Sequence, residues 1–151
     1  MKNSFRLLAI LLAASFTLTF CDKDDEATPT TLYDRLGGIG AISAVTDQFL
    51  TNVVGDNVIN ARFAATVANP ARTQLLRNNL IDQICAGAGG PCQYKGKTML
   101  ESHKGMNITD AEFNALVGDL VAALDKFNVP QKEKDELLAI LGPMKSDIVG
   151  K

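Results

Sequence analysis

Few side chains in this sequence can carry chemistry, and most of them fall in one short stretch. The 151 residues include a single histidine, His103, and three cysteines, Cys21, Cys85 and Cys92. A neutral imidazole is a common metal ligand and an acid–base group near neutral pH. One imidazole also suffices to hold a haem iron on its proximal side. Because most lone histidines are surface or structural residues, the sequence around His103 must decide between these roles.

Cys85 and Cys92 have two open interpretations. Outside the cytoplasm they could form a disulfide, and closing such a short loop would stabilise the fold by about 2–3 kcal/mol. Alternatively both remain free thiols, with Cys85 buried on a helix face. They are not a c-type haem attachment site, which requires the pattern C-x-x-C-H. A zinc site built from Cys85, Cys92 and His103 would lack a fourth ligand and has the wrong spacing.

Residues 1–20 predict a signal peptide. Lys2 and Arg6 give a short positive start, and an apolar run of 14 residues follows from Leu7 to Phe20. This run is too short for a comfortable transmembrane helix and suits the apolar region of a secretion signal. We therefore expect an extracytoplasmic protein of the cell envelope.

The run Leu18-Thr-Phe-Cys21 resembles a bacterial lipobox, in which the cysteine thiol is acylated. Phe20 departs from that pattern, because a small residue normally precedes the cysteine. We expect membrane contact only through a lipid anchor on Cys21, on the periplasmic or the exterior face; cleavage near Ala13 is the alternative. The charged segment that follows ends near Pro29, and residues 21–30 are predicted to form a flexible tether.

Residues 31–151 are predicted to form one all-α domain. A net charge of −2 and the absence of a basic stripe argue against a nucleic-acid partner. Every convincing segment has helical periodicity, and none alternates like a strand. Helix starts are predicted at Thr31, at Asn69-Pro70 and at Thr109, where Glu112 completes a capping box.

Helices are expected over 31–36, 41–54, 58–63, 70–86, 110–127 and 130–148, with the last one interrupted at Gly142-Pro143. Between two strong helices, residues 87–98 predict a loop, and a single short turn precedes His103. A plain helical bundle would not need this weak segment. A chain that covers a flat cofactor would.

Several motifs together resemble the truncated haemoglobins, short globins with a two-over-two helical sandwich. The resemblance covers about residues 32–149 and is nearest to the first subgroup. It rests on these motifs: Leu32-Tyr-Asp-Arg-Leu-Gly-Gly38, Phe49, Phe63, Gly89-Gly-Pro-Cys-Gln-Tyr-Lys-Gly96, Met99-Leu-Glu-Ser-His103 and Asn107-Ile-Thr109.

The resemblance implies that His103 binds the iron of haem b through Nε2 and that an acceptor orients its other nitrogen. Phe49 and Phe63 would pack on the porphyrin, and Tyr94 and Met99 would line its proximal edge. Lys97 and Lys104 could reach a propionate or could be ordinary solvated lysines. The residues implied to contact the cofactor are Phe49, Leu50, Phe63, Leu76, Leu80, Tyr94, Met99 and Leu116.

The distal side departs from the family pattern. Leu50 stands where many members have a tyrosine, and Leu76 and Leu80 stand where polar residues are frequent. A missing hydrogen bond of roughly 1–3 kcal/mol predicts weaker retention of oxygen, with carbon monoxide less affected. Because residues 63–76 are longer than in typical members, a polar side chain could enter the pocket instead. The candidates are Gln74, Asn79 and Gln83.

The resemblance implies a haem protein that binds oxygen, nitric oxide or carbon monoxide. A second hypothesis is an enzyme that dioxygenates nitric oxide or reduces nitrite or peroxide. It would need an external reductant, and no catalytic acid–base residue is evident. A third hypothesis is a haem-free helical interaction module, in which His103 is dispensable.

Overall fold

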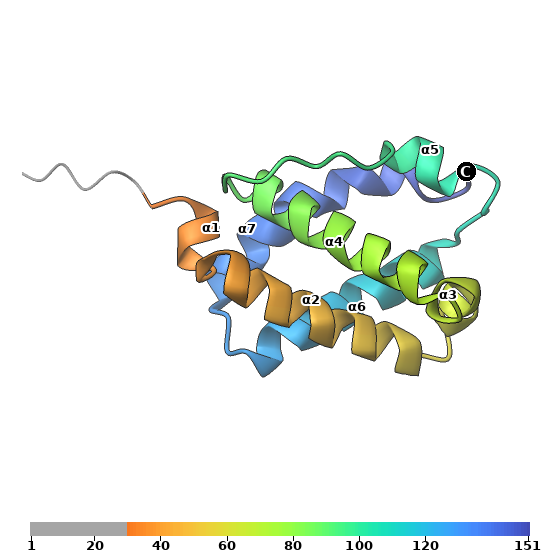
Figure 1. Ribbon diagram of the computed structural model, residues 1–151, viewed down its shortest axis with the longest axis horizontal. Coiled ribbons are helices and arrows are strands. Elements are labelled where there is room, and N and C mark those ends of the chain that lie inside the picture. Colours follow the sequence, from red (N-terminus) through yellow and green to blue (C-terminus); the bar gives the residue numbers. More distant parts are fainter. Residues whose placement is uncertain (1–29) are drawn as a thin grey trace, which may run out of the picture.

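The long helices lie in two layers in the computed structural model, which describes residues 30–151 (Figure 1). Helices α2 (Gly38–Gly55) and α4 (Pro70–Gly87) form one layer and contact each other. Helices α6 (Asp110–Lys126) and α7 (Gln131–Leu141) lie behind them, with α6 packed on α2. This is the all-α, two-over-two arrangement expected from the sequence.

Short elements connect these layers. They are α1 (Leu32–Arg35), α3 (Asn60–Val67), α5 (Met99–His103) and the 3₁₀ helix η1 (Gly142–Asp147). Helix α5 lies against η1, and the segment between α4 and α5 is non-helical, as predicted. The last helix is interrupted at Gly142-Pro143, because proline removes a backbone donor and clashes with the preceding turn.

The predicted helix starts are confirmed by the caps. The Thr31 hydroxyl accepts from the backbone N–H of Asp34, and the Asp34 carboxylate accepts from the backbone N–H of Thr31. Thr109 and Glu112 form the same reciprocal pair at the start of α6. Asn69 accepts from the backbone N–H of Arg72, with Pro70 in the first turn.

Two helices, α2 and α3, differ most from their expected bounds. Helix α2 begins at Gly38 instead of Ala41, because Gly37 adopts a left-handed conformation (φ 92°) that turns the chain from α1 directly into α2. Helix α3 runs over Asn60–Val67 and so continues beyond Phe63. The longer α3 accounts for part of the long segment before Leu76.

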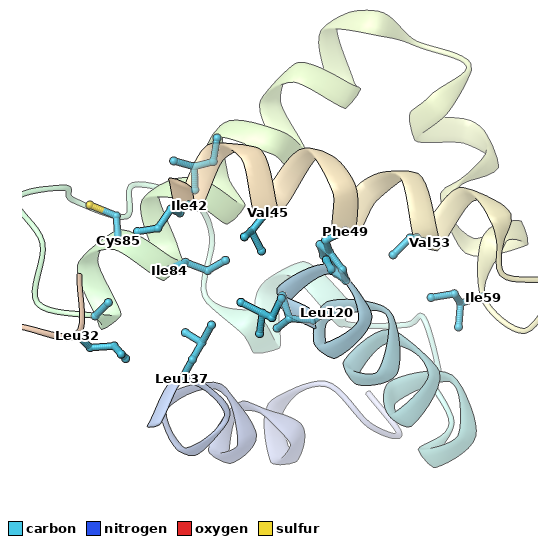
Figure 2. Close-up of a cluster of buried hydrophobic side chains, with 14 residues drawn as sticks. Leu32, Ile42, Val45, Phe49, Val53, Ile59, Ile84, Cys85, Leu120 and Leu137 are labelled. Atoms are coloured by element: carbon cyan, nitrogen blue, oxygen red, sulfur yellow. The ribbon is translucent and has the colours of Figure 1, made fainter. Parts of the chain in front are cut away.

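Cys85 and Cys92 are joined by a disulfide, with Cα atoms 5.7 Å apart. The structure thereby selects one of the two interpretations left open by the spacing. Cys85 is fully buried and belongs to the apolar core (Figure 2). The labelled part of that core contains Leu32, Ile42, Val45, Phe49, Val53, Ile59, Ile84, Cys85, Leu120 and Leu137.

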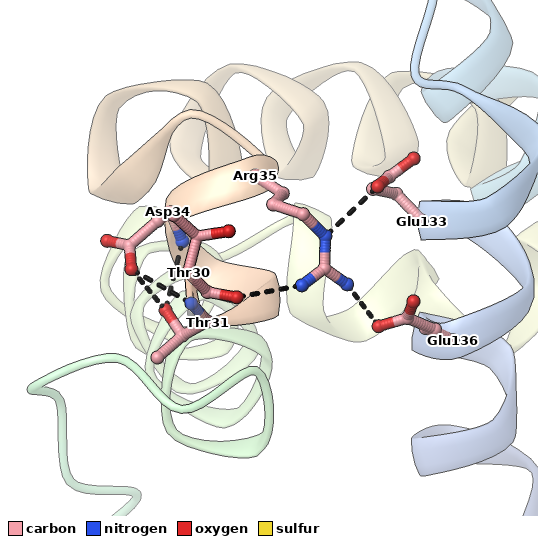
Figure 3. A network of polar contacts seen from close by, with 6 residues as sticks. All are labelled: Thr30, Thr31, Asp34, Arg35, Glu133 and Glu136. Carbon is pink, nitrogen blue, oxygen red and sulfur yellow. Dashed lines mark hydrogen bonds and ion pairs between the residues drawn. The ribbon is translucent and has the colours of Figure 1, made fainter. Parts of the chain in front are cut away.

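Polar contacts fasten α1 to α7 (Figure 3). Nε of Arg35 donates to Glu133 at 3.0 Å, and its Nη atoms donate to the Thr30 carbonyl oxygen and to Glu136. The buried Glu133 carboxylate is therefore paired, which a charge removed from water requires. These contacts hold α1 against α7 beside the apolar core.

The expected signal peptide, the lipid-anchor residue Cys21 and the tether up to residue 29 lie outside the described residues. Within residues 30–151, no helix has both the length and the apolar character needed to cross a membrane.

Candidate functional site

His103 stands between two cavities. The first has a volume of about 380 Å³ and the second about 410 Å³, which is within the range of small-molecule sites. Four side chains line both cavities: His103, Phe113, Leu116 and Ile148. The two cavities therefore adjoin along these residues, with His103 on the shared wall, and we call the pair the crevice.

Local contacts set the position of the short helix α5. The Thr98 hydroxyl accepts from the backbone N–H of Glu101 at 3.2 Å, and the Glu101 carboxylate accepts from the hydroxyl and the backbone N–H of Thr98. The Thr98 hydroxyl, followed by its backbone N–H, lowers the pKa of the Glu101 carboxyl. The sequence Thr98-Met-Leu-Glu101 forms a capping box, so local residues determine where α5 begins.

The imidazole of His103 is oriented by its own helix. Nδ1 lies 2.7 Å from the carbonyl oxygen of Met99, one turn earlier. A carbonyl oxygen can only accept, so Nδ1 carries the proton in the neutral ring. Nε2 then has the free lone pair, and this tautomer is the one that metal-bound histidines adopt.

The second cavity is almost wholly apolar. The predicted contact residues Phe49, Leu80, Met99 and Leu116 all line it. Gln83 is its polar member from α4, and its amide donates to the thioether sulfurs of Met99 at 3.5 Å and Met144 at 3.2 Å. These contacts tie α4 to α5 and η1 across the cavity.

The first cavity is apolar inside and charged at its edge. Phe63 and Leu76 line it, as the resemblance implied, and Asn79 lines it as one of the polar candidates. Two arginines, Arg62 and Arg72, also border it. Glu112 lines this cavity too and pairs with Arg62, so among the described residues Arg72 is the guanidinium left to face a carboxylate. Apolar walls with such a group at the edge suit a flat apolar cofactor that carries carboxylates.

Other predicted residues lie elsewhere. Leu50 and Tyr94 line neither cavity. The Tyr94 hydroxyl donates to the carbonyl oxygen of Lys97 at 2.8 Å, and its ring packs against Gly96, so it shapes the loop before α5. Burial raises the pKa of Tyr94.

Three polar or basic candidates also lie outside the cavities. Lys97 and Lys104 line neither of them, and Gln74 instead donates to Asn78. The basic side chains that line the cavities are instead Arg62 and Arg72 in the first and Lys145 in the second. Of the suggested polar candidates, Asn79 and Gln83 remain at the cavity walls.

Sequence reasoning missed several lining residues. Phe113 lies on the apolar face that predicted α6, but nothing in that pattern separates a cavity wall from ordinary core. Met144 and Ile148 come from the interrupted last helix, and their apolar spacing likewise predicts only burial. No sequence motif indicates that Arg62 lines a cavity.

Among residues 30–151, no group of three or more His, Cys, Asp or Glu side chains could hold a bare metal ion. A metal bound to this single imidazole would therefore have to belong to a cofactor that brings its own remaining ligands. A porphyrin iron has that donor set, and the mostly apolar lining of the cavities has a matching polarity. The described residues therefore fit haem.

Comparisons with known proteins agree with this geometry. The family model described as "Bacterial-like globin" matches residues 31–149. A group 1 truncated haemoglobin of Tetrahymena pyriformis is 32% identical over 123 residues, which cover 82% of this chain and 98% of that protein. One from Mycolicibacterium paratuberculosis is 31% identical, covering 82% of this chain and 87% of that protein.

Solved structures share the fold. The truncated haemoglobin of Tetrahymena pyriformis in its Fe(III) form superposes with a TM-score of 0.73 at 30% identity, covering 81% of this chain and 100% of that one. The 2/2 haemoglobin of Synechococcus sp. PCC 7002, described as cyanomet with covalently attached haem, gives 0.71 at 26% identity, covering 80% of this chain and 98% of that one. The expected two-over-two fold is thereby confirmed.

Proposed function

This chain belongs to the bacterial-like globin family, and from this premise we propose that it is a group 1 truncated haemoglobin that holds haem b and binds oxygen or another diatomic gas. The observation that carries the proposal is the placement of His103. The imidazole lies on the wall shared by both cavities, and its Nδ1 is tied to the Met99 carbonyl oxygen at 2.7 Å.

Haem b, when bound, supplies the iron at which a diatomic gas binds. His103 would ligate that iron through Nε2, and Met99 would keep the ring from rotating. Phe49, Phe63 and Leu116 would cover the porphyrin faces and keep water out. Metal-bound histidines usually donate the N–H of their other ring nitrogen to an acceptor such as the Met99 carbonyl oxygen.

The charged edge of the first cavity supports one orientation of the haem, with a propionate on the side of Arg72. Arg72 borders the first cavity and has no ion-pair partner within the part of the chain that the structure describes. A guanidinium suits a carboxylate because it donates in a planar fork. We infer that Arg72 faces a haem propionate and that Lys97 and Lys104 do not.

The distal chemistry follows from the apolar walls. Leu76 and Leu80 line the cavities, and neither can donate a hydrogen bond. Asn79 and Gln83 are the nearby amides on α4, but the Gln83 amide already donates to Met99 and Met144. Asn79 lines the first cavity and is the remaining amide on α4 that could donate to a bound gas. Without a hydrogen bond from Asn79, the protein should hold carbon monoxide well and oxygen weakly.

We also propose that the domain works outside the cytoplasm, anchored through Cys21. The signal-like residues 1–20 support this, and so does the Cys85–Cys92 disulfide, because structural disulfides persist mainly in oxidising compartments. Labelling with a palmitate analogue and membrane fractionation test it, with Cys21→Ser as the control. Unlabelled wild-type protein in the cytoplasmic fraction would refute the anchor.

Absorption spectra test the haem proposal. The protein, purified with hemin supplied, is compared with His103→Ala and with Lys104→Ala, a neighbouring exposed residue that lines neither cavity. We expect a Soret band that shifts when carbon monoxide is added to the reduced protein. The shift should be altered in His103→Ala and unchanged in Lys104→Ala. If wild-type protein takes up no haem, the haem-free interaction module becomes the better hypothesis.

A further inference from the structure

Arg62 joins three segments at the edge of the first cavity. From α3, its Nε donates to Oε1 of Glu112 at 2.6 Å, and its Nη2 donates to Oε2 at 3.1 Å. Its Nη1 donates to the carbonyl oxygen of Met106 at 2.9 Å. Glu112 belongs to α6, and Met106 lies in the turn that follows α5. All three guanidinium nitrogens are therefore used between elements, a geometry that lysine cannot reproduce.

The turn held by Arg62 is bonded directly to the backbone of His103. The backbone N–H of Met106 donates to the carbonyl oxygen of His103 at 3.0 Å. Met106 thus contacts His103 through its N–H and Arg62 through its carbonyl. On either side of it, Gly105 (φ 82°) and Asn107 (φ 49°) take left-handed conformations that reverse the chain tightly. The position of this turn fixes the end of α5.

The other partner of Arg62 is itself immobilised. The Glu112 carboxylate also accepts from the backbone N–H of Thr109 at 2.8 Å and from its hydroxyl at 2.9 Å. Arg62 is therefore attached to the first turn of α6, which is followed by Phe113 and Leu116 on the wall shared by both cavities. One side chain links that wall to the turn behind the histidine.

Helix α5 needs such an external support. It has only 5 residues, and a helix this short is unstable without tertiary contacts. Its start is fixed by the Thr98–Glu101 capping box, and the ring of His103 by the Met99 carbonyl. Neither contact fixes the C-terminal end of α5 relative to the opposite wall. The contacts of Arg62 supply that link to α3 and α6, while the backbone N–H of Asn107, which donates to the carbonyl oxygen of Lys151 at 2.6 Å, holds the same segment to the C-terminal residues.

We propose that Arg62 is a positioning residue for His103, which sets the imidazole relative to the crevice by fastening Met106 to α3 and α6. The effect of Arg62 on the bond between His103 and haem iron rests on the proposed function. Its effect on the position of the turn at Met106 does not. Arg62 acts through Met106 and has no direct part in ligation. Residues that orient a metal-bound histidine commonly change metal affinity by roughly 10–100-fold when they are replaced.

The chain contains a matched control for this ion pair. On α4, Arg77 donates to Asp47 of α2 through Nε at 2.5 Å and through Nη2 at 2.9 Å, the same two-point geometry. Arg77 lines neither cavity and makes no contact with the turn at Met106. Arg77→Met therefore removes a similar two-point ion pair that has no hydrogen bond to the turn after His103.

The experiment compares wild type, Arg62→Met, Arg77→Met and Glu112→Gln. Glutamine can keep the capping box at the start of α6 while it removes the charge that holds Arg62. Three quantities are measured: hydrogen exchange of the Met106 amide without haem, the Fe–His stretching band of the ferrous haem protein, and the rate of haem transfer to an acceptor apoglobin. The last two need haem, and the first does not.

We expect Arg62→Met to speed exchange at Met106, to shift or broaden the Fe–His band, and to lose haem roughly 10-fold faster. Glu112→Gln should change all three in the same direction, and it decides the question if Arg62→Met does not fold. Arg77→Met should match wild type. Wild-type values in Arg62→Met and Glu112→Gln, or equal changes in Arg77→Met, would overturn the proposal.

Failure of the proposed function gives a different result. If wild-type protein takes up no haem, the haem proposal fails. The positioning role of Arg62 is then tested only by the hydrogen-exchange rate of the Met106 amide. Faster exchange in Arg62→Met than in Arg77→Met supports the positioning role. Unchanged exchange overturns it.

Discussion

Where α1 meets α7, the apolar side chains leave a void of about 10 Å³, whereas around His103 two cavities of about 380 and 410 Å³ remain. We call the first region the packed end. It is lined by Leu36, Ala41, Ile42, Val45, Ile84, Leu124, Val129 and Leu137. The open end comprises the residues that line the two larger cavities. The same four long helices, α2, α4, α6 and α7, contribute to both ends.

The difference shows how one domain can be stable and hollow. The packed end has close-packed apolar residues, with the disulfide and the Arg35 ion pairs nearby. The open end is held by polar contacts. Those of Arg62 join α3 to α6 and to the turn after α5, and the Thr98–Glu101 capping box fixes the start of α5. An apolar hollow loses packing energy that a bound cofactor can restore. The packed end can therefore keep the fold formed before haem arrives.

The largest expected effect comes from creating a cavity at the packed end. Leu137 is 1% exposed there, and Leu137→Ala should lower the free energy of unfolding by about 2–5 kcal/mol. Leu75 borders the open end and is 61% exposed, so Leu75→Ala should change it by less than about 0.5 kcal/mol. Urea unfolding measures both. Equal losses would show that the two ends do not differ in packing.

Removal of the disulfide should weaken the packed end by a smaller amount. The cysteines are separated by 7 positions, and a loop of this length is worth about 2–3 kcal/mol. Cys85→Ala combined with Cys92→Ala should lose that much stability in urea unfolding, and reduced wild type should behave similarly. A double variant as stable as the oxidised wild type would show that the bond does not support this end.

A polar residue in the open end should change gas binding instead of stability. Leu80→Gln gives the second cavity an N–H donor. If the gas binds beside Leu80, oxygen dissociation should slow by about 10–100-fold, equivalent to about 1.5–3 kcal/mol, with carbon monoxide affected less. Stopped-flow kinetics measures both gases. Equal slowing of both would indicate a changed access route rather than a new hydrogen bond.

Acid should loosen the open end through Glu112. The Arg62 guanidinium, followed by the Thr109 backbone N–H and hydroxyl, lowers the pKa of the Glu112 carboxyl to about 2. Because this pKa lies below that of the unfolded chain, the stabilisation is present above about pH 4.5 and is lost as pH falls toward 2. Arg62→Met should show a shallower loss of stability over this interval in urea unfolding at several pH values. An unchanged slope would contradict the link.

The helices could be predicted because their starts are encoded locally. Thr31, Asn69 and Thr109 each satisfy backbone donors a few residues away, and the structure confirms these caps. The box at Thr98–Glu101 carried the same signal, although only a short turn had been predicted there. The early start of α2 could not be predicted from periodicity, because it depends on the left-handed conformation of Gly37.

The site could be predicted only where a motif marked it. The family motif around His103 identified the residue, and the structure places it on the crevice. The family resemblance implied that Leu50 and Tyr94 contact the cofactor, but both lie outside the two cavities. Arg62 and Glu112 are 50 residues apart, so their contact exists only in the fold. The disulfide likewise needed three-dimensional distances to be decided.

The most direct test of the account uses the fact that the chain has a single histidine. Protein grown with ¹⁵N-labelled histidine carries the label at position 103 and nowhere else. Resonance Raman spectra of the ferrous haem protein should show an Fe–His stretching band that moves to lower frequency with the label. A haem-loaded protein with no such band, or with one that the label does not move, would contradict His103 as the iron ligand.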